Sequence, residues 1–253
     1  MFISKLFIGL TIIGLFCVPC FAENTVEPFT EEWIDKYQCY EAAFPDVDNG
    51  VYYVRDGVLF WENILVAYPC EKTDKEYVVP DGIEMIADGA FADNQYLEKV
   101  VLPSSVISIG DFAFEFCREL REINLPDRLL VIGCHAFSQC RSLENIVLPP
   151  NLYGIGCHAF CEASKLAGTL TIPASVHFIG SEALALTKIS TIIFEGYICE
   201  LGGGLIGEPN PSIQYEIHVP SVEYTFSEQL QSRYGVIYDN IVIVEMIPDP
   251  SLE

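Results

Sequence analysis

Prolines recur along the middle of the chain at an almost constant interval. Successive prolines are 23 residues apart and the last interval is 24: Pro80, Pro103, Pro126, Pro149 and Pro173. Each is followed by an aliphatic residue three positions later and by Ile six positions later. The first four also have Ala and Phe at ten and eleven. A fixed apolar period of this length is typical of solenoids, whose stacked repeats bury one continuous core.

The segment before each proline alternates between apolar and polar positions. In one repeat we expect Leu120, Ile123 and Leu125 to face inward. Glu122 and Asn124 would then face outward. This alternation predicts one short parallel strand per repeat, which the proline ends because it has no N–H to donate to the ladder.

The residues after each proline predict the opposite side of the solenoid. A Gly-x-x-Ala-Phe segment indicates a tight turn or a single helical turn. Its glycine indicates close packing rather than positive φ, because the first repeat has Ala87 at this position. The Phe side chains are expected to stack in one buried file. That file would comprise Phe91, Phe114, Phe137 and Phe160, continued by Leu184 and Ile206.

A degenerate sixth repeat keeps the phase, with Glu195 in the proline slot. Its segment "LGGGLIG" could also suggest a phosphate-binding loop. Such a loop needs a following helix and a Lys, and the sequence here offers neither. We therefore interpret the glycines as a degenerate turn, which gives about six repeats of 22–25 residues.

The repeats resemble a known family. Units such as "LPSSVISIGDFAFEFCRELREI" and "LPDRLLVIGCHAFSQCRSLENI" resemble leucine-rich repeats of the BspA or Treponema type, with the pattern LxxIxLPxxVxxIGxxAFxxC. The resemblance covers roughly residue 51 to the C-terminus. It implies a leucine-rich repeat solenoid, a β-rich right-handed coil, and a surface or secreted binding protein such as an adhesin.

Five segments are expected along the chain. Residues 1–22 form a signal peptide and 23–50 an N-terminal cap. Residues 51–79 resemble the family's variant first unit and would contain a hairpin. Residues 80–219 hold the repeats, and 220–253 form a C-terminal capping unit. Both caps are expected to be helical, the second because apolar residues recur at helical spacing. These residues are Val222, Phe226, Leu230 and Tyr234.

The N-terminal residues predict export. One Lys, a short apolar run and small residues up to Ala22 are typical of a secretory signal peptide. Lipidation of Cys17 or Cys20 is the alternative. A bacterial lipidation motif has a small residue before the cysteine, whereas Phe16 and Pro19 stand there in this sequence. No later segment is long and apolar enough to cross a membrane. The mature protein is therefore expected to be secreted or at the cell surface, without an integral membrane segment.

The charge of the chain limits its partners. Asp and Glu number 36 against 13 Lys and Arg, which gives a formal net charge of -23. A polyanion is bound mainly through Lys and Arg that displace its counterions. We therefore expect neither nucleic acid nor anionic lipid as a partner.

The segment "IGCHAF" occurs twice and sets cysteine beside histidine in two adjacent repeats. Equivalent positions in stacked repeats lie about 5 Å apart, so Cys134 should neighbour Cys157, and His135 should neighbour His158. Consecutive side chains point to different sides, which argues against convergence on a metal. We expect no metal and no cofactor. A disulfide between Cys134 and Cys157 stays open.

The other cysteines divide into two groups. Cys117 and Cys140 occupy the family's cysteine position and are expected to be buried, reduced and apolar in character. Cys39 and Cys70 lie outside the regular repeats. In an exported protein they are the best candidates for a structural bridge, between the N-terminal cap and the first unit.

Outward positions of the predicted strands suggest where a ligand would bind. Four and five residues before the proline slots, acidic and basic residues alternate from repeat to repeat in the N-terminal half. Such charges would pair with one another. Two residues before the slots the row is more apolar, and we take it as the candidate binding face. It comprises Val101, Asn124, Val147, Thr171 and Ile193.

The sequence favours a binding protein over an enzyme. It contains no nucleophile elbow, zinc-helix motif or dinucleotide fingerprint. The leading hypothesis is a monomeric, non-catalytic module that recognises a protein or glycan, as in surface adhesion. A self-assembling structural component of the envelope is the alternative. A metal or thiol enzyme is a third, which the "IGCHAF" segments alone would support.

Overall fold

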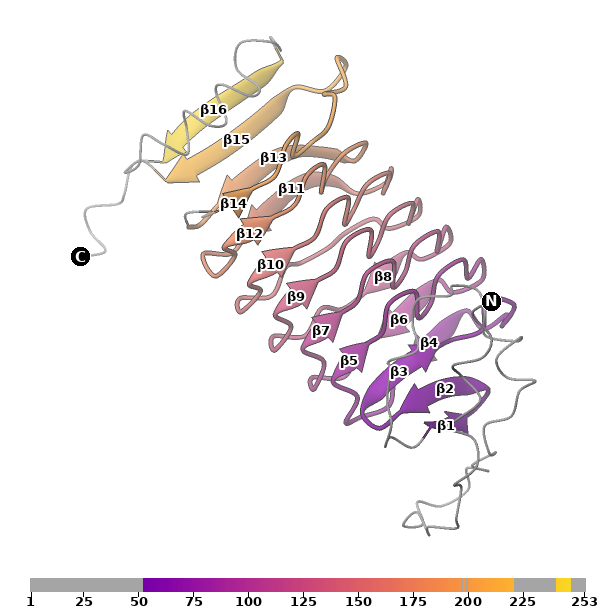
Figure 1. Ribbon diagram of the computed structural model, residues 1–253. Helices are drawn as coiled ribbons and strands as arrows, with labels where there is room; N and C mark the ends of the chain where they lie inside the picture. Colours follow the sequence, from indigo (N-terminus) through magenta and orange to yellow (C-terminus); the bar gives the residue numbers. More distant parts are fainter. Residues whose placement is uncertain (1–51, 197, 199, 221–239, 247–253) are drawn as a thin grey trace, which may run out of the picture.

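The computed structural model describes residues 52–196, 198, 200–220 and 240–246. The described chain is a β-solenoid whose repeats stack along one axis (Figure 1). The predicted signal peptide and N-terminal cap lie outside the described residues, as do the four apolar residues of the predicted C-terminal helix. No helix occurs in the described part of the chain. The described part of the predicted C-terminal unit is a strand, β16 (Ile241–Met246).

A nine-stranded sheet runs along the side of the solenoid that follows the prolines (Figure 1). β1 (Tyr52–Arg55), β2 (Val58–Trp61) and β3 (Ile64–Ala67) form an antiparallel meander at its N-terminal end. From β3 onward each strand pairs in parallel with the next. These strands are β5 (Met85–Ile86), β7 (Ser108–Ile109), β9 (Val131–Ile132), β10 (Gly154–Ile155), β12 (Phe178–Ile179) and β14 (Glu200–Leu201).

The strands predicted before the prolines form two further parallel sheets. The first is β4 (Glu76–Val78), β6 (Lys99–Val101) and β8 (Glu122–Ile123). The second is β11 (Ala167–Ile172), β13 (Lys188–Phe194), β15 (Tyr215–Pro220) and β16. Parallel strands, one before each proline slot, are thus present in every repeat except the one before Pro149, where residues 143–148 carry no strand.

The side chain of Asn124 explains why β8 is short. Its amide oxygen accepts the Leu102 N–H at 2.7 Å, and its amide nitrogen donates to the Leu102 carbonyl at 2.8 Å. These are the two backbone groups that the next ladder pair would use. The ladder between β6 and β8 therefore ends at Ile123, and a side-chain bridge replaces it.

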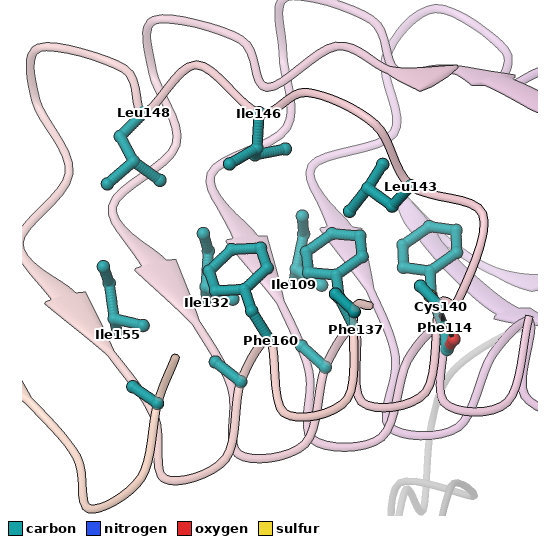
Figure 2. Close-up of a cluster of buried hydrophobic side chains, with 14 of the residues drawn as sticks. Ile109, Phe114, Ile132, Phe137, Cys140, Leu143, Ile146, Leu148, Ile155 and Phe160 are labelled. Carbon is teal, nitrogen blue, oxygen red and sulfur yellow. Dashed lines mark hydrogen bonds between the residues drawn. The ribbon is translucent and has the colours of Figure 1, made fainter. Parts of the chain in front are cut away.

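The predicted file of Phe side chains fills the core and is confirmed. Phe91, Phe114, Phe137 and Phe160 are at most 1% exposed. Their rings stack in parallel with centroid separations of 4.7, 5.1 and 5.3 Å. Figure 2 shows Phe114, Phe137 and Phe160 of this file beside a second file of Ile109, Ile132 and Ile155. Leu184 and Ile206 continue the Phe file as buried residues, as expected.

Four of the five prolines are followed seven residues later by a glycine, and at these glycines the backbones of neighbouring repeats pack directly on each other. A Cβ added to Gly156 would lie 2.5 Å from the carbonyl carbon of Gly133 and would also overlap the Cys134 amide nitrogen. Gly133 and Gly180 show the same overlap with the repeat before them. None of these three has positive φ. The expected reason for glycine, close packing of backbone on backbone, is therefore confirmed.

Candidate functional site

The face that carries β4, β6 and β8 is covered by paired charges. Lys99 Nζ lies 3.6 Å from Glu76 and 3.8 Å from Glu122. Glu98 lies 2.9 Å from Lys75 and 3.5 Å from Arg121. The expected pairing of these alternating charges is confirmed. Exposed pairs of this kind contribute at most about 1 kcal/mol each, and their charges largely cancel.

The predicted binding row lies on this same side of the solenoid. Val147 is 81% exposed, Thr171 and Asn124 are exposed, and Val101 and Ile193 are half-buried. The row is interrupted, because the Asn124 amide is bound to Leu102 and the repeat of Val147 has no strand. A role for these residues in ligand binding stays a prediction.

A second apolar surface lies on the nine-stranded sheet, and it was not predicted from the sequence. Leu130, Val131 and Tyr153 are 45%, 41% and 55% exposed. Together with Ile107 and Phe178, they form what we call the apolar band. These side chains stand four or five residues after a proline slot, between the buried positions three and six. The signal was present in "LLVIG", "LYGIG" and "VHFIG", where apolar residues fill both intervening positions or one of them.

Main-chain hydrogen bonds hold the band in register. Leu130 N–H donates to Ile107 O at 2.9 Å, and Tyr153 N–H donates to Leu130 O at 2.7 Å. Gly154 pairs with Val131 on one side and Phe178 on the other. The missing side chain of Gly154 leaves room that Phe178 borders, since a Cβ there would lie 3.6 Å from the Phe178 ring. The band is therefore continuous across repeats.

Two carboxylates stand at the ends of the apolar band. Ile107 N–H donates to the Glu84 carbonyl. Glu84 is therefore the equivalent of Ile107 in the preceding repeat and lies next to it at the N-terminal end of the band. Glu200 is in register with Phe178 on the next strand. The Glu84 carboxylate accepts a hydrogen bond from Asn63 Nδ2 at 2.6 Å. Among the described residues, no Lys, Arg or His forms an ion pair with either carboxylate.

The two "IGCHAF" segments place their imidazoles in a surface stack. The rings of His135 and His158 lie 4.7 Å apart and 7° from parallel, and Phe112 stacks on His135 at 5.0 Å. All three residues have positive φ, between 55° and 58°. Glu115 lies 3.8 Å from His135, and Glu182 lies 3.5 Å from His158. The expected neighbourhood of the two histidines is confirmed.

Beside the histidines, a row of side chains accepts hydrogen bonds from the backbone of the next repeat, and the Cys134 thiol belongs to this row. Asp111 Oδ1 accepts the Cys134 N–H at 2.6 Å, and Ser181 Oγ accepts the Gly203 N–H at 3.1 Å. The Cys134 thiol is likewise hydrogen bonded to the backbone and the thiol of Cys157, and burial raises its pKa. Both cysteines are thiols in the structure. A disulfide between them, like the Cys39–Cys70 bridge, whose first member lies outside the described residues, stays a prediction.

No three His, Cys, Asp or Glu side chains in the described part of the chain converge in a way that would hold an ion. Cys134 instead caps backbone and His135 stacks on a ring, as their equivalents do in other repeats. These contacts account for the "IGCHAF" residues as parts of the repeat.

The imidazole stack predicts a pH-dependent contribution to stability. Burial and the nearby His158 lower the pKa of His135, against the opposing effect of Glu115 and Asp111. The folded state therefore binds fewer protons than the unfolded chain, whose His pKa is about 6.5. This contribution is complete above about pH 6.5 and is lost as the pH falls through the lowered folded pKa.

The variant His135→Phe isolates this effect, because Phe112 holds the same backbone conformation in the preceding repeat. We expect urea unfolding to show a smaller loss of stability between about pH 7.5 and about pH 5 in the variant than in the wild type. An equal loss in both proteins would contradict the expectation.

Cys117 and Cys140 are buried as expected. They donate their S–H groups to the carbonyls of Phe91 and Phe114 at 3.0 and 3.1 Å. Both are thiols, and burial raises the pKa of each. Because the thiolate is the reactive form, we expect them to resist alkylation in the native protein. Partly exposed Cys161 should be modified before either of them, as peptide mass spectrometry would show, and early labelling of Cys117 would contradict this.

The repeat region matches a known protein family. The family model of the BspA type leucine rich repeat region matches residues 73–204 in six copies, more than half of the 253 residues. The chain belongs to the BspA-type leucine-rich repeat family. The search of curated proteins gave no match. None of the described segments is a helix of the length and apolar character needed to cross a bilayer.

Solved structures of bacterial leucine-rich repeat proteins resemble this BspA-type chain. The pneumococcal vaccine antigen PcpA matches with a TM-score of 0.61 and 26% identity, over 81% of this chain and 50% of that one. A leucine-rich cell surface protein of Faecalibacterium prausnitzii matches with 0.51 and 30%, over 62% and 40%. The T. pallidum leucine-rich repeat protein matches with 0.50 and 26%, over 72% and 91%. The chain thus spans half or less of the first two.

Proposed function

We propose that this BspA-type protein is an exported, non-catalytic module of the cell surface that binds a protein or a glycan. The apolar band carries the proposal, because adjacent exposed apolar side chains on a regular sheet are typical of interaction surfaces, whereas single ones are common everywhere. The signal-like N-terminus supports export. Two of the similar solved structures are a vaccine antigen and a cell surface protein, and this likeness supports a surface location.

The repeat architecture supports binding over catalysis. Each repeat fixes its buried positions and leaves the positions between them free to vary, so a solenoid presents an extended surface. Some of the reactive groups in the repeats take part in structural contacts. Cys134 caps backbone, and Glu98 and Lys99 pair with their neighbours.

The test is a binding screen with the exported, purified protein against a glycan array and a panel of displayed surface proteins. We expect saturable binding to members of one class. Light scattering on the same sample separates a monomeric binder from a self-assembling component, which would show a concentration-dependent mass. A monomer that binds neither class would overturn the proposed function.

A further inference from the structure

We propose that the apolar band, with Glu84 and Glu200 at its ends, docks a protein surface that is apolar at its centre and carries Lys or Arg at both ends. The inference deepens the proposed function, on which it rests, by assigning one face and one partner chemistry. It favours a protein over a glycan. It also moves the expected contact from the row of Val147 to the nine-stranded sheet.

The dimensions of the band fit a protein contact. Ile107, Leu130, Tyr153 and Phe178 come from four successive repeats, and Glu84 and Glu200 come from the repeats on either side. Five inter-repeat spacings of about 4.8 Å give about 24 Å between the two acidic rows. Strand pairing is continuous over this length, in contrast to the row of Val147, whose repeat has no strand.

The band is also ordered before any partner arrives. The ring of Tyr153 stacks on His177 with a centroid separation of 5.0 Å and a tilt of 16°. Phe178 is seated against Gly154, and the backbone of each row is tied to its neighbours. A partner would therefore immobilise few side chains. Preorganised surfaces bind more tightly because less conformational entropy is lost.

The charges decide which partner fits. On the opposite face Lys75, Lys99 and Arg121 already neutralise the strand carboxylates. Glu84 and Glu200 have no such cation among the described residues, and the whole chain carries a formal net charge of -23. Covering a carboxylate without pairing it is costly. A partner that covers the band therefore gains by placing cations at both ends, which a neutral glycan does not do.

The direct test uses two synthetic peptides with the same apolar centre, one flanked by Lys and the other by Glu. Titration at low and moderate salt measures both dissociation constants for the purified full chain. We expect the Lys-flanked peptide to bind at least tenfold more tightly, with a preference that shrinks as salt rises. Equal binding of the two peptides, or binding of neither, overturns the inference.

Four variants locate the contact. Tyr153→Asp should weaken binding of the Lys-flanked peptide at least tenfold, and Glu200→Gln should weaken it severalfold while reducing the salt dependence. Val147→Asp tests the competing row, because it places the same charge at an exposed apolar position on the other face. The matched control is Leu186→Asp, at a position that is 60% exposed and belongs to neither surface, and it should change nothing. Loss of binding in Val147→Asp with full binding in Tyr153→Asp would assign the contact to the other face.

The outcomes separate this inference from the proposed function. A glycan or protein from the screen that binds Tyr153→Asp as well as wild type leaves the binding module standing and removes the apolar band as its site. If the screen finds no ligand but the Lys-flanked peptide binds more tightly than the Glu-flanked one, the proposed function is overturned. The inference that the apolar band prefers an apolar partner with flanking cations then still holds. Thermal melting of each variant confirms that the fold is retained.

Discussion

Replacing Phe137 by Ala is expected to lower the free energy of unfolding by about 3 to 5 kcal/mol. The side chain is fully buried and stacks between Phe114 and Phe160 at 5.1 and 5.3 Å. Its removal loses two ring contacts and leaves a cavity lined by rigid neighbours. The backbone cannot collapse into that cavity because the Phe137 N–H donates to Ala159 O at 2.7 Å. Urea denaturation measures the change.

The matched control for this variant is Tyr153→Ala. It also removes an aromatic ring that stacks on a neighbouring ring, but from a position that is 55% exposed. We expect a change of at most about 0.5 to 1 kcal/mol, as for other surface substitutions. If the two variants unfolded at the same urea concentration, the Phe file would not be the stabilising core of the solenoid.

The period of the sequence was sufficient to predict the core. A residue type that returns at one interval must occupy one position of the stacked repeat, so the spacing alone places Phe91 to Phe160 in one file. Burial of Cys117 and Cys140 was expected from the resemblance, because they occupy the family's cysteine position three residues after Phe. The prediction of the Phe file needed only the stacking rule.

The nine-stranded sheet could not be predicted from the alternation that reveals longer strands. Strands such as β9 (Val131–Ile132) contribute two residues each, which is too short for a period of two to be seen. The apolar band was missed for a related reason. A repeat pattern consists of the positions that stay the same in every repeat, whereas Leu130 and Tyr153 stand at positions that vary between repeats.

The side-chain contacts between repeats could not be predicted from the sequence either. The spacing predicted that Asn124 faces outward, but it could not show that the amide would bind both backbone groups of Leu102. The proximity of His135 to His158 was predicted, whereas their parallel stacking depends on the positive φ of both residues. Contacts of this kind are set by backbone angles, which one-letter patterns do not carry.

Replacing Gly156 by Ala is expected to destabilise the fold by about 3 kcal/mol, at the upper end of the usual cost of overpacking. The new methyl group would meet the carbonyl carbon of Gly133 at 2.5 Å and the backbone of Cys134. Both are main-chain groups that no rotamer change can move. The Gly156 N–H also donates to Ile132 O at 2.8 Å, so relief would require the ladder between the two repeats to open.

Gly154→Ala, in strand β10 and two residues before Gly156, provides the control. A Cβ there finds its nearest neighbour, the Phe178 ring, at 3.6 Å, an ordinary van der Waals contact. Neither glycine has positive φ, so the two variants differ in the space around the methyl group rather than in backbone conformation. We expect Gly154→Ala to unfold within about 1 kcal/mol of wild type. If Gly156→Ala were equally mild, adjacent repeats would have room to separate, and the backbone contact would not set their spacing.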